Sequence, residues 1–439
     1  MTIDALTFRR MIRPVGRVLR DDFLRHSALV FAASMAGNVL NYAFNFALSR
    51  RLGVEGYATL SSLTSFLMLL SIPTSVLTLV VVKYAAVFHA ANDAQRIRRL
   101  SELLLKFTGI AALCAFIAGM AASGSIAAFL RIPDNGAIVL CVAIIALGLV
   151  TPSLRGILQG EQDFFRYSIS TVVEAFLKVS CGVLLVYAGY GPAGAMLGWT
   201  IGTLCALAYT VWAVMSKHGS KAGPRVRLAL DGRRLFSTTL GVGLTTAFLT
   251  CITFMDVLLV KHYFAPHHAG LYAAVNLTGK VILFLAASVP AVVLPKAASK
   301  SARGDNPVPM LVQAAGATLL MCAVPLLLFG LLPAQTIRLI AGSAFAGAAP
   351  YVFQYDLAMA LLAMVTLVAN YKMGLHRFNF LYALGVVLVA EVAGIATLHH
   401  SLWDVIHILL AGNAVLLACS LYRIVPPGSA QKLSHERVA

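Results

Sequence analysis

Twelve long apolar stretches occupy most of this chain, and they limit its fold more than any other feature. A helix needs about 20 apolar residues to cross a bilayer core roughly 30 Å thick. The stretches therefore predict an all-α polytopic membrane protein with about 12 transmembrane helices. Of 439 residues, 59% are hydrophobic and 12% are charged, which is too little charge for a water-soluble surface. We expect the spans at residues 27–49, 57–82, 105–129, 136–158, 164–190, 193–215, 235–260, 270–295, 310–331, 346–371, 378–398 and 402–423.

Lysine and arginine alternate between the two sides of the predicted membrane. With the N-terminus in the cytoplasm, 27 of the 34 Lys and Arg residues fall in cytoplasmic segments and 5 fall outside. The other two, Lys178 and Lys280, lie inside predicted spans. This positive-inside pattern predicts that both termini are cytoplasmic. Topology and contact with anionic headgroups thus explain the net charge of +17, and no nucleic-acid partner is expected.

The chain also repeats itself on either side of a basic linker. The first span ends in NFALSRRLGVEGYATLSS and the seventh in DVLLVKHYFAPHHAGLYAAVN, and Pro73 and Pro290 lie within the spans that follow. Six spans in each half give the halves the same orientation, as in one class of secondary transporters. We expect two lobes related by a pseudo-twofold axis along the membrane normal, with a cavity at their interface. The predicted order is a basic interfacial segment at 1–26, lobes at 27–216 and 235–424 around a linker at 217–234, and a cytoplasmic tail at 425–439.

Polar side chains form a stripe along the first span. Asn38, Asn41 and Asn45 follow one another at steps of three and four residues, which places them on one helix face. Three amides facing lipid would be costly because hydrocarbon offers no hydrogen bonds. The stripe therefore indicates a water-filled cavity that binds substrate, with hydrogen bonding between helices as the alternative.

Ionisable side chains also lie at bilayer depth, where each is costly unless it is paired or hydrated. They are Glu174, Lys178, Asp256, Lys280, Asp356 and Glu391. One interpretation is a pathway in which Lys178, Lys280 and Asn276 bind an anionic substrate such as a diphosphate. Asp256, Glu174, Asp356 or Glu391 would then couple transport to protons or sodium. The other interpretation is structural pairing, of Glu174 with Lys178 and of Lys280 with Asp256 or Asp356.

No catalytic motif is present, and we expect neither an enzyme nor a cofactor. The sequence has no P-loop, no H-E-x-x-H and no G-x-S-x-G pattern. The 7 cysteines lie in apolar spans without metal-ligand spacing, so no metal site is expected either. Energy for transport would have to come from ion or substrate gradients.

Several stretches resemble bacterial membrane proteins of polysaccharide biosynthesis. They are LGVEGYATLSSLTSFLMLLSIPTSVLTLVVVKYAA, DVLLVKHYFAPHHAGLYAA, FLAASVPAVVLPKAASKSARG and RGILQGEQDFFRYS. The last contains Arg155, Gly156, Gln159 and Gly160, a motif expected in the cytoplasmic loop between spans four and five. The chain thus resembles the lipid-linked oligosaccharide flippases for O-antigen, capsule and exopolysaccharide. These belong to the multidrug/oligosaccharidyl-lipid/polysaccharide exporter superfamily.

The resemblance implies a transport reaction at the bacterial cell (inner) membrane. An undecaprenyl-diphosphate-linked oligosaccharide would move from the inner to the outer leaflet by alternating access, for lipopolysaccharide or exopolysaccharide biosynthesis. The implied partners are membrane lipids, the lipid-linked glycan, and a polysaccharide polymerase or glycosyltransferases. Cationic cavity groups are also implied, and Lys178, Lys280 and Arg50 fit them. Ser65 stands where the second half has Lys280, so a charge-symmetric cavity is not expected.

Two other functions stay open. One is a cation-coupled multidrug antiporter of the same superfamily, which would favour an acidic and aromatic cavity. The other is a non-transporting membrane scaffold for a polysaccharide assembly complex.

Overall fold

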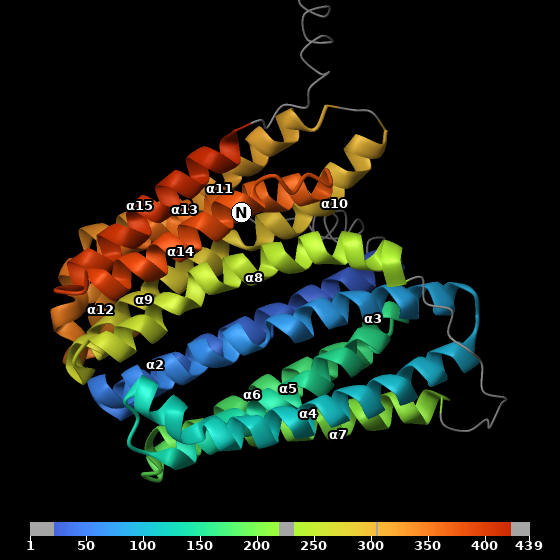
Figure 1. The fold of residues 1–439 in the computed structure, drawn as a ribbon, viewed down its shortest axis with the longest axis horizontal. Coiled ribbons are helices and arrows are strands. Elements are labelled where there is room, and N and C mark those ends of the chain that lie inside the picture. Colours follow the sequence, from blue (N-terminus) through green and yellow to red (C-terminus); the bar gives the residue numbers. More distant parts are fainter. Residues whose placement is uncertain (1–21, 219–231, 304–305, 423–439) are drawn as a thin grey trace, which may run out of the picture. The chain divides into compact units, whose positions relative to one another are not determined.

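The computed structural model describes residues 22–218, 232–303 and 306–422. Every regular element within these ranges is helical and none is a strand, which confirms the all-α prediction (Figure 1). The first half contains α2 (Asp22–Leu70), α3 (Ile72–Ala90), α4 (Ala94–Leu130), α5 (Asn135–Gly160), α6 (Phe164–Tyr187) and α7 (Gly191–His218). The second half contains α8 (Gly232–Tyr263), α9 (Pro266–Ala286), α10 (Ser288–Ala302), α11 (Val308–Leu331), α12 (Pro333–Ile340), the 3-10 helix η1 (Ser343–Tyr351), α13 (Val352–Gly374), α14 (Leu381–Thr397) and α15 (Leu402–Leu421).

The predicted spans fall on these helices. Within the described residues, ten helical segments are long and apolar enough to cross a membrane by length and composition. The two remaining predicted spans, 27–49 and 378–398, correspond to the start of α2 and to the shorter apolar helix α14. The structure is therefore consistent with about twelve membrane helices. The sequence did not predict α12, which lies where a loop was expected, and it placed most of η1 at the start of the predicted span 346–371.

The second and eighth predicted spans are each interrupted near a proline. A break at Ser71 separates α2 from α3 just before Pro73, and a break at Ala287 separates α9 from α10 just before Pro290. Proline lacks an N–H and clashes with the preceding helical turn, so it favours such breaks. The interruptions occur at matching positions of the two sequence repeats. Pro152, in contrast, lies inside α5, which continues through it.

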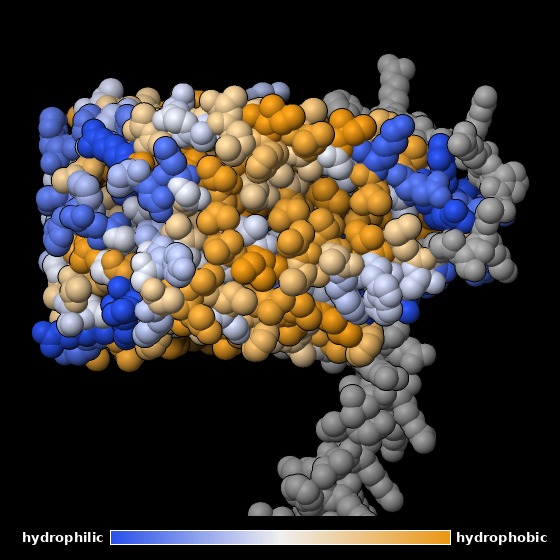
Figure 2. All heavy atoms as spheres, turned by 90° about the horizontal axis from the view of Figure 1, so that it is seen from below, coloured by the Kyte–Doolittle hydropathy of each residue, from blue (hydrophilic) through white to orange (hydrophobic). Residues whose placement is uncertain are grey.

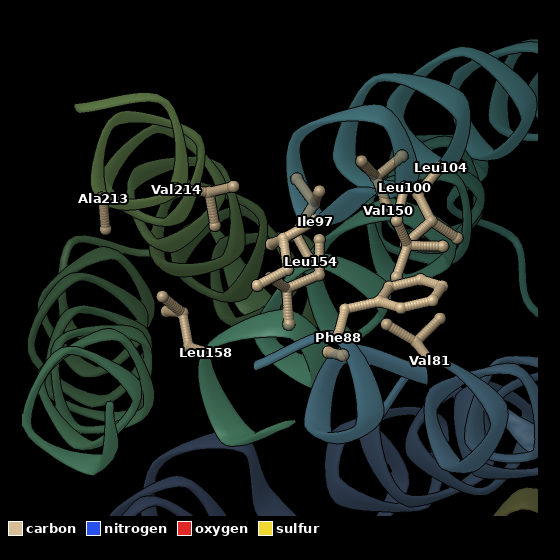
Figure 3. Close-up of a cluster of buried hydrophobic side chains, with 12 residues drawn as sticks. Val81, Phe88, Ile97, Leu100, Leu104, Val150, Leu154, Leu158, Ala213 and Val214 are labelled. Carbon is tan, nitrogen blue, oxygen red and sulfur yellow. The ribbon is translucent and has the colours of Figure 1, made fainter. Parts of the chain in front are cut away.

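The described chain packs into two compact units. Unit 1 comprises the described parts of residues 1–47, 74–123 and 136–231. Its apolar core brings together α3, α4, α5 and α7, with Phe88, Ile97, Leu154 and Val214 among the buried side chains (Figure 3). This core holds α5 in place, and α5 carries one member of the site described below.

Unit 2 comprises 48–73, 124–135 and the described parts of 232–439. The two early segments join it through specific contacts. The Tyr57 ring meets Phe345 edge to face at 5.9 Å, and Nδ1 of His262 lies 2.7 Å from the carbonyl oxygen of Phe129. These packing units differ from the predicted lobes, so the division at 27–216 and 235–424 stays a prediction. The predicted segments 1–26, 217–234 and 425–439 lie outside the described residues, apart from 22–26, 217–218 and 232–234.

The outer surface of the helices is apolar. Large side chains such as Phe107 and Leu113 on α4 and Leu320 and Val324 on α11 are more than half exposed. Figure 2 shows hydrophobic residues over the middle of the helices and hydrophilic residues toward their ends. Such a surface is unfavourable in water and suits lipid. The chain is therefore a multi-pass membrane protein.

Candidate functional site

Close packing of α6 against α7 builds the framework of the site in unit 1. Three glycines recur at steps of four residues along α7: Gly194, Gly198 and Gly202. A Cβ atom added at Gly198 would lie 2.2 Å from the backbone nitrogen of Gly182, and one at Gly202 would lie 2.9 Å from that of Lys178. Small residues at this spacing let two membrane helices approach backbone to backbone. The side chains next to these glycines are thereby held directly against α6.

Lys178 is buried at this contact, with 7% of its surface exposed. Its ammonium donates a hydrogen bond of 2.8 Å to Oδ1 of Asn41 on α2. The same nitrogen lies 3.5 Å from the ring centroid of Trp199 and 4.8 Å from that of Phe44. Aromatic faces attract cations, and the attraction grows when the cation is removed from water. The surroundings of Lys178 are thus an aromatic cage closed by one amide.

Glu174, one helical turn before Lys178, binds a different cation. Its Oε2 lies 2.7 Å from Nη2 of Arg155 on α5, and its Oε1 accepts a hydrogen bond of 3.0 Å from Thr203 on α7. Arg155 also donates two hydrogen bonds of 2.8 Å to Ser170, one to the hydroxyl and one to the carbonyl. The predicted local pair of Glu174 with Lys178 is therefore wrong, because Arg155 offers the carboxylate a planar, multivalent donor.

The motif expected in the loop between spans four and five is helical instead. Arg155, Gly156, Gln159 and Gly160 all lie in the last turns of α5, so the loop prediction is wrong. The two glycines allow α5 to pack closely on α3, because a Cβ at Gly160 would lie 2.6 Å from the carbonyl oxygen of Val82. Gln159 is exposed. The glycines of the motif therefore pack α5 against α3, and its arginine forms the ion pair with Glu174 of α6.

The asparagine stripe on α2 is largely accessible. Asn38 and Asn41 are exposed, and Asn45 is half-buried. Nδ2 of Asn45 donates a hydrogen bond of 2.9 Å to the backbone carbonyl of Asn41. Asn41 accepts the hydrogen bond from Lys178. The stripe therefore presents amides on the surface of unit 1 and connects to the buried cation at one point.

Unit 2 contains a second polar cluster, centred on Asp256 of α8. Oδ2 of Asp256 accepts hydrogen bonds from Tyr272 of α9 at 2.6 Å and from Tyr355 of α13 at 3.2 Å. Nδ2 of Asn276 contacts the Tyr355 hydroxyl at 2.5 Å. All four residues are buried. Asn276 was predicted to bind substrate, but in the structure it is a buried member of this cluster.

Three carboxylates of unit 2 each keep a buried oxygen without a hydrogen-bond partner. Oδ1 of Asp356 accepts a hydrogen bond of 2.8 Å from Thr278, whereas its Oδ2 has no partner among the described residues. The same holds for Oδ1 of Asp256 and Oε1 of Glu391. Among the residues that the structure describes, no three His, Cys, Asp or Glu side chains gather to hold a metal ion. These three carboxylates are therefore not arranged as a metal site of three such ligands.

Lys280 of α9 differs from Lys178. The Phe254 ring centroid lies 5.0 Å from its Nζ. Within residues 22–218, 232–303 and 306–422, the Lys280 ammonium makes neither a hydrogen bond nor an ion pair, although Asp256 is near enough to attract it. Lys280 is half-buried. An ion pair with Asp256 or Asp356, the alternative interpretation of the sequence, does not form between these described residues.

Arg50, a suggested cavity cation, instead closes a helix end. Its guanidinium donates to the carbonyl oxygens of Arg338, Leu339 and Ile340, with nitrogen–oxygen distances of 3.3, 2.5 and 3.3 Å. These are the last carbonyls of α12, which have no partners within their own helix. Arg50 thus attaches the end of the first span to α12 within unit 2.

Sequence reasoning missed the partners of the charged groups. Phe44 and Trp199 were not singled out, and neither was Tyr355, which precedes Asp356. The glycine series on α7 was the available signal for Trp199 and Thr203, because these residues directly follow Gly198 and Gly202. Tyr355 carried no comparable signal, since its role depends on the packing of α13 against α8 and α9.

Comparisons with known proteins agree with this architecture. A family model described as polysaccharide biosynthesis protein matches residues 23–299. Stage V sporulation protein B of Bacillus subtilis (strain 168) is 25% identical over 240 residues, which cover 52% of this chain and 46% of that protein. The chain thus spans about half the length of this curated relative.

Solved structures share the fold. A multidrug resistance MATE family transporter of the MOP superfamily, in its inward-facing conformation, gives a TM-score of 0.73 at 12% identity, over 94% of this chain and 99% of that one. Lipid II flippase MurJ, in its inward closed conformation, gives 0.68 at 14% identity, over 94% and 91%.

Proposed function

Because the chain belongs to the polysaccharide biosynthesis protein family, we propose that it flips a lipid-linked glycan across the bacterial cytoplasmic membrane. The substrate class is an undecaprenyl-diphosphate-linked oligosaccharide, moved from the inner to the outer leaflet by alternating access. Both termini lie in the cytoplasm in this proposal. A polysaccharide polymerase or glycosyltransferases would act before or after the transport step.

The observation that carries the proposal is the state of Lys280. An ammonium at bilayer depth is costly unless it is hydrated or bound to an anion. No acceptor among the described residues satisfies Lys280, so it is free to bind the diphosphate as that group passes. Asn38, which is exposed on unit 1, supplies an accessible amide for the hydroxyl-rich glycan. The lipid tail can stay in the hydrocarbon while Lys280 binds the diphosphate.

Cation coupling is the second part of the proposal, and it assigns Asp256, Asp356 or Glu391. Each holds an oxygen that is buried and lacks a donor, which a bound proton or sodium ion would satisfy. Asp256 is the first choice because two tyrosines already orient it. An Asp256→Asn variant should transport equally well with and without an imposed proton or sodium gradient, whereas the wild type should respond to one of them. A variant that keeps the wild-type gradient response would exclude Asp256 from coupling.

The proposal is tested by purified protein in liposomes that carry a fluorescent undecaprenyl-diphosphate glycan in both leaflets. Quenching of the label in the outer leaflet measures how fast the lipid exchanges between leaflets. The expected result is an exchange rate well above that of protein-free liposomes. A matched arm replaces the glycan lipid with a cationic dye and imposes a proton gradient. Dye transport without glycan transport would instead support the multidrug antiporter. Transport of neither would support the scaffold.

A further inference from the structure

Lys178 dictates which way the Asn41 carboxamide faces. A lysine ammonium has three donors and no acceptor, so only the amide oxygen of Asn41 can lie against it. The 2.8 Å contact between Nζ and Oδ1 has this arrangement. The Nδ2 amino group of Asn41 must then point away from Lys178. Among the described residues, no acceptor receives this amino group.

The cage keeps the lysine in this role. The rings of Trp199 and Phe44 both lie near the ammonium, and the backbone of Lys178 is held by the approach of Gly202. Lys178 is 7% exposed, whereas Asn41 is exposed. A ligand that approaches this face of unit 1 therefore meets the Asn41 amino group before it meets the ammonium.

A cation behind an amide also makes the amide a better donor. Hydrogen bonds in a chain polarise one another, so donation from Lys178 to the Asn41 oxygen strengthens donation from the Asn41 nitrogen. The positive charge behind the amide favours a negatively charged oxygen over a neutral one. The arrangement is unsuitable for an organic cation, since the aromatic faces that would bind one already hold Lys178.

We propose that Lys178 is a positioning residue that acts on the ligand through Asn41, whose outward amino group donates to an anionic oxygen of a polyprenyl diphosphate. The inference rests on the proposed function and deepens it, because it names the group in unit 1 that recognises the diphosphate. Lys178 itself does not touch the ligand. In this respect it differs from Lys280, whose ammonium makes no hydrogen bond or ion pair with the described residues.

The test is a double-mutant cycle on the full-length protein in nanodiscs, with farnesyl diphosphate as the probe and farnesol as the control for folding. Lys178→Met should weaken farnesyl diphosphate binding about tenfold, the worth of one hydrogen bond to a charged group. Asn41→Ala should weaken binding by a similar factor. In the Asn41→Ala background, Lys178→Met should cause no further loss, because its effect passes through the missing amide.

A second variant covers the case in which Lys178→Met fails to fold. Asn41→Asp has the same shape and keeps an oxygen for Lys178, but it removes the outward amino group. It should lose at least as much affinity as Asn41→Ala while its farnesol binding stays unchanged. Wild-type affinity in Asn41→Asp, or an equal effect of Lys178→Met in both backgrounds, would overturn the inference.

Two further results separate this inference from the proposed function. If the wild type binds farnesyl diphosphate and the cycle is additive, the inference alone is wrong. If the wild type does not bind farnesyl diphosphate at all, both the inference and the proposed substrate class are wrong. Equal affinity for inorganic pyrophosphate would show that the prenyl chain adds nothing to binding, which counts against a polyprenyl diphosphate as the ligand and so against both the inference and the proposed substrate class.

Discussion

The two lysines at bilayer depth have opposite surroundings. Lys178 in unit 1 has an amide at 2.8 Å and two aromatic rings around it, while Lys280 in unit 2 has one ring at 5.0 Å and no acceptor within the described chain. The carboxylates differ in the same way: Glu174 is paired with Arg155, whereas Asp356 keeps an oxygen without a partner. Lys178 and Glu174 thus bind partners within unit 1, whereas the Lys280 ammonium and one oxygen of Asp356 have no hydrogen-bond partner among the described residues. Depth in the membrane alone does not distinguish these roles.

Replacing one carboxylate in each unit by its amide gives the sharpest contrast. Glu174→Gln should lower the free energy of unfolding by about 2 kcal/mol, because Arg155, whose side chain is only 12% exposed, would lose its counter-charge. Asp356→Asn should change it by no more than about 0.5 kcal/mol, since the amide oxygen still accepts from Thr278 and no cation loses a partner. Unfolding in mixed micelles measures both. Equal losses would mean that the two units do not differ.

The rigidity of unit 1 can be tested at its glycines. Gly198→Ala should destabilise the protein by about 2 kcal/mol, because the new methyl group would strike the backbone of Gly182. Gly109→Ala on α4 is the matched control, since nothing lies within 4 Å of its added Cβ. That change should stabilise the protein by up to about 1 kcal/mol through helix propensity. Thermal unfolding in detergent compares the two, and a tolerated Gly198→Ala would argue against the close contact.

The smallest effect is expected from removing each lysine. Lys178→Met should cost about 1 kcal/mol of stability, because it loses a hydrogen bond and its contact with Trp199. Lys280→Met should leave stability unchanged or slightly raised, because no hydrogen bond is lost and a costly charge is removed. The same micelle titration measures the difference. A clear loss in Lys280→Met would reveal a structural role for that lysine.

Hydropathy predicted the helices well, because each crossing must satisfy its backbone hydrogen bonds within its own segment. The breaks near Pro73 and Pro290 were also accessible, since proline acts locally. The partners of the charged side chains could not be predicted in this way. Spacing of four residues joined Glu174 to Lys178, but the true partners, Arg155 and Asn41, come from other helices, the latter 137 residues away. Tertiary packing determines which cation pairs with which carboxylate, and helical periodicity alone does not predict that packing.

The small elements were equally hidden. The eight-residue helix α12 lies in a stretch with too little apolar length for a span, so the sequence predicted a loop there. Arg50 was assigned to a cavity because of its charge, although its partners are the carbonyls at the end of α12. Charge indicates that a side chain needs a partner, and only the packing shows whether the protein already supplies one.

The central claim is that Lys280 is free to bind the diphosphate of a lipid-linked substrate. The affinity of wild type and Lys280→Met for farnesyl diphosphate, with farnesol as the neutral counterpart, tests it most directly. We predict that the variant binds farnesyl diphosphate at least about tenfold more weakly and binds farnesol as the wild type does. Unchanged affinity for farnesyl diphosphate in a folded Lys280→Met protein would contradict the account.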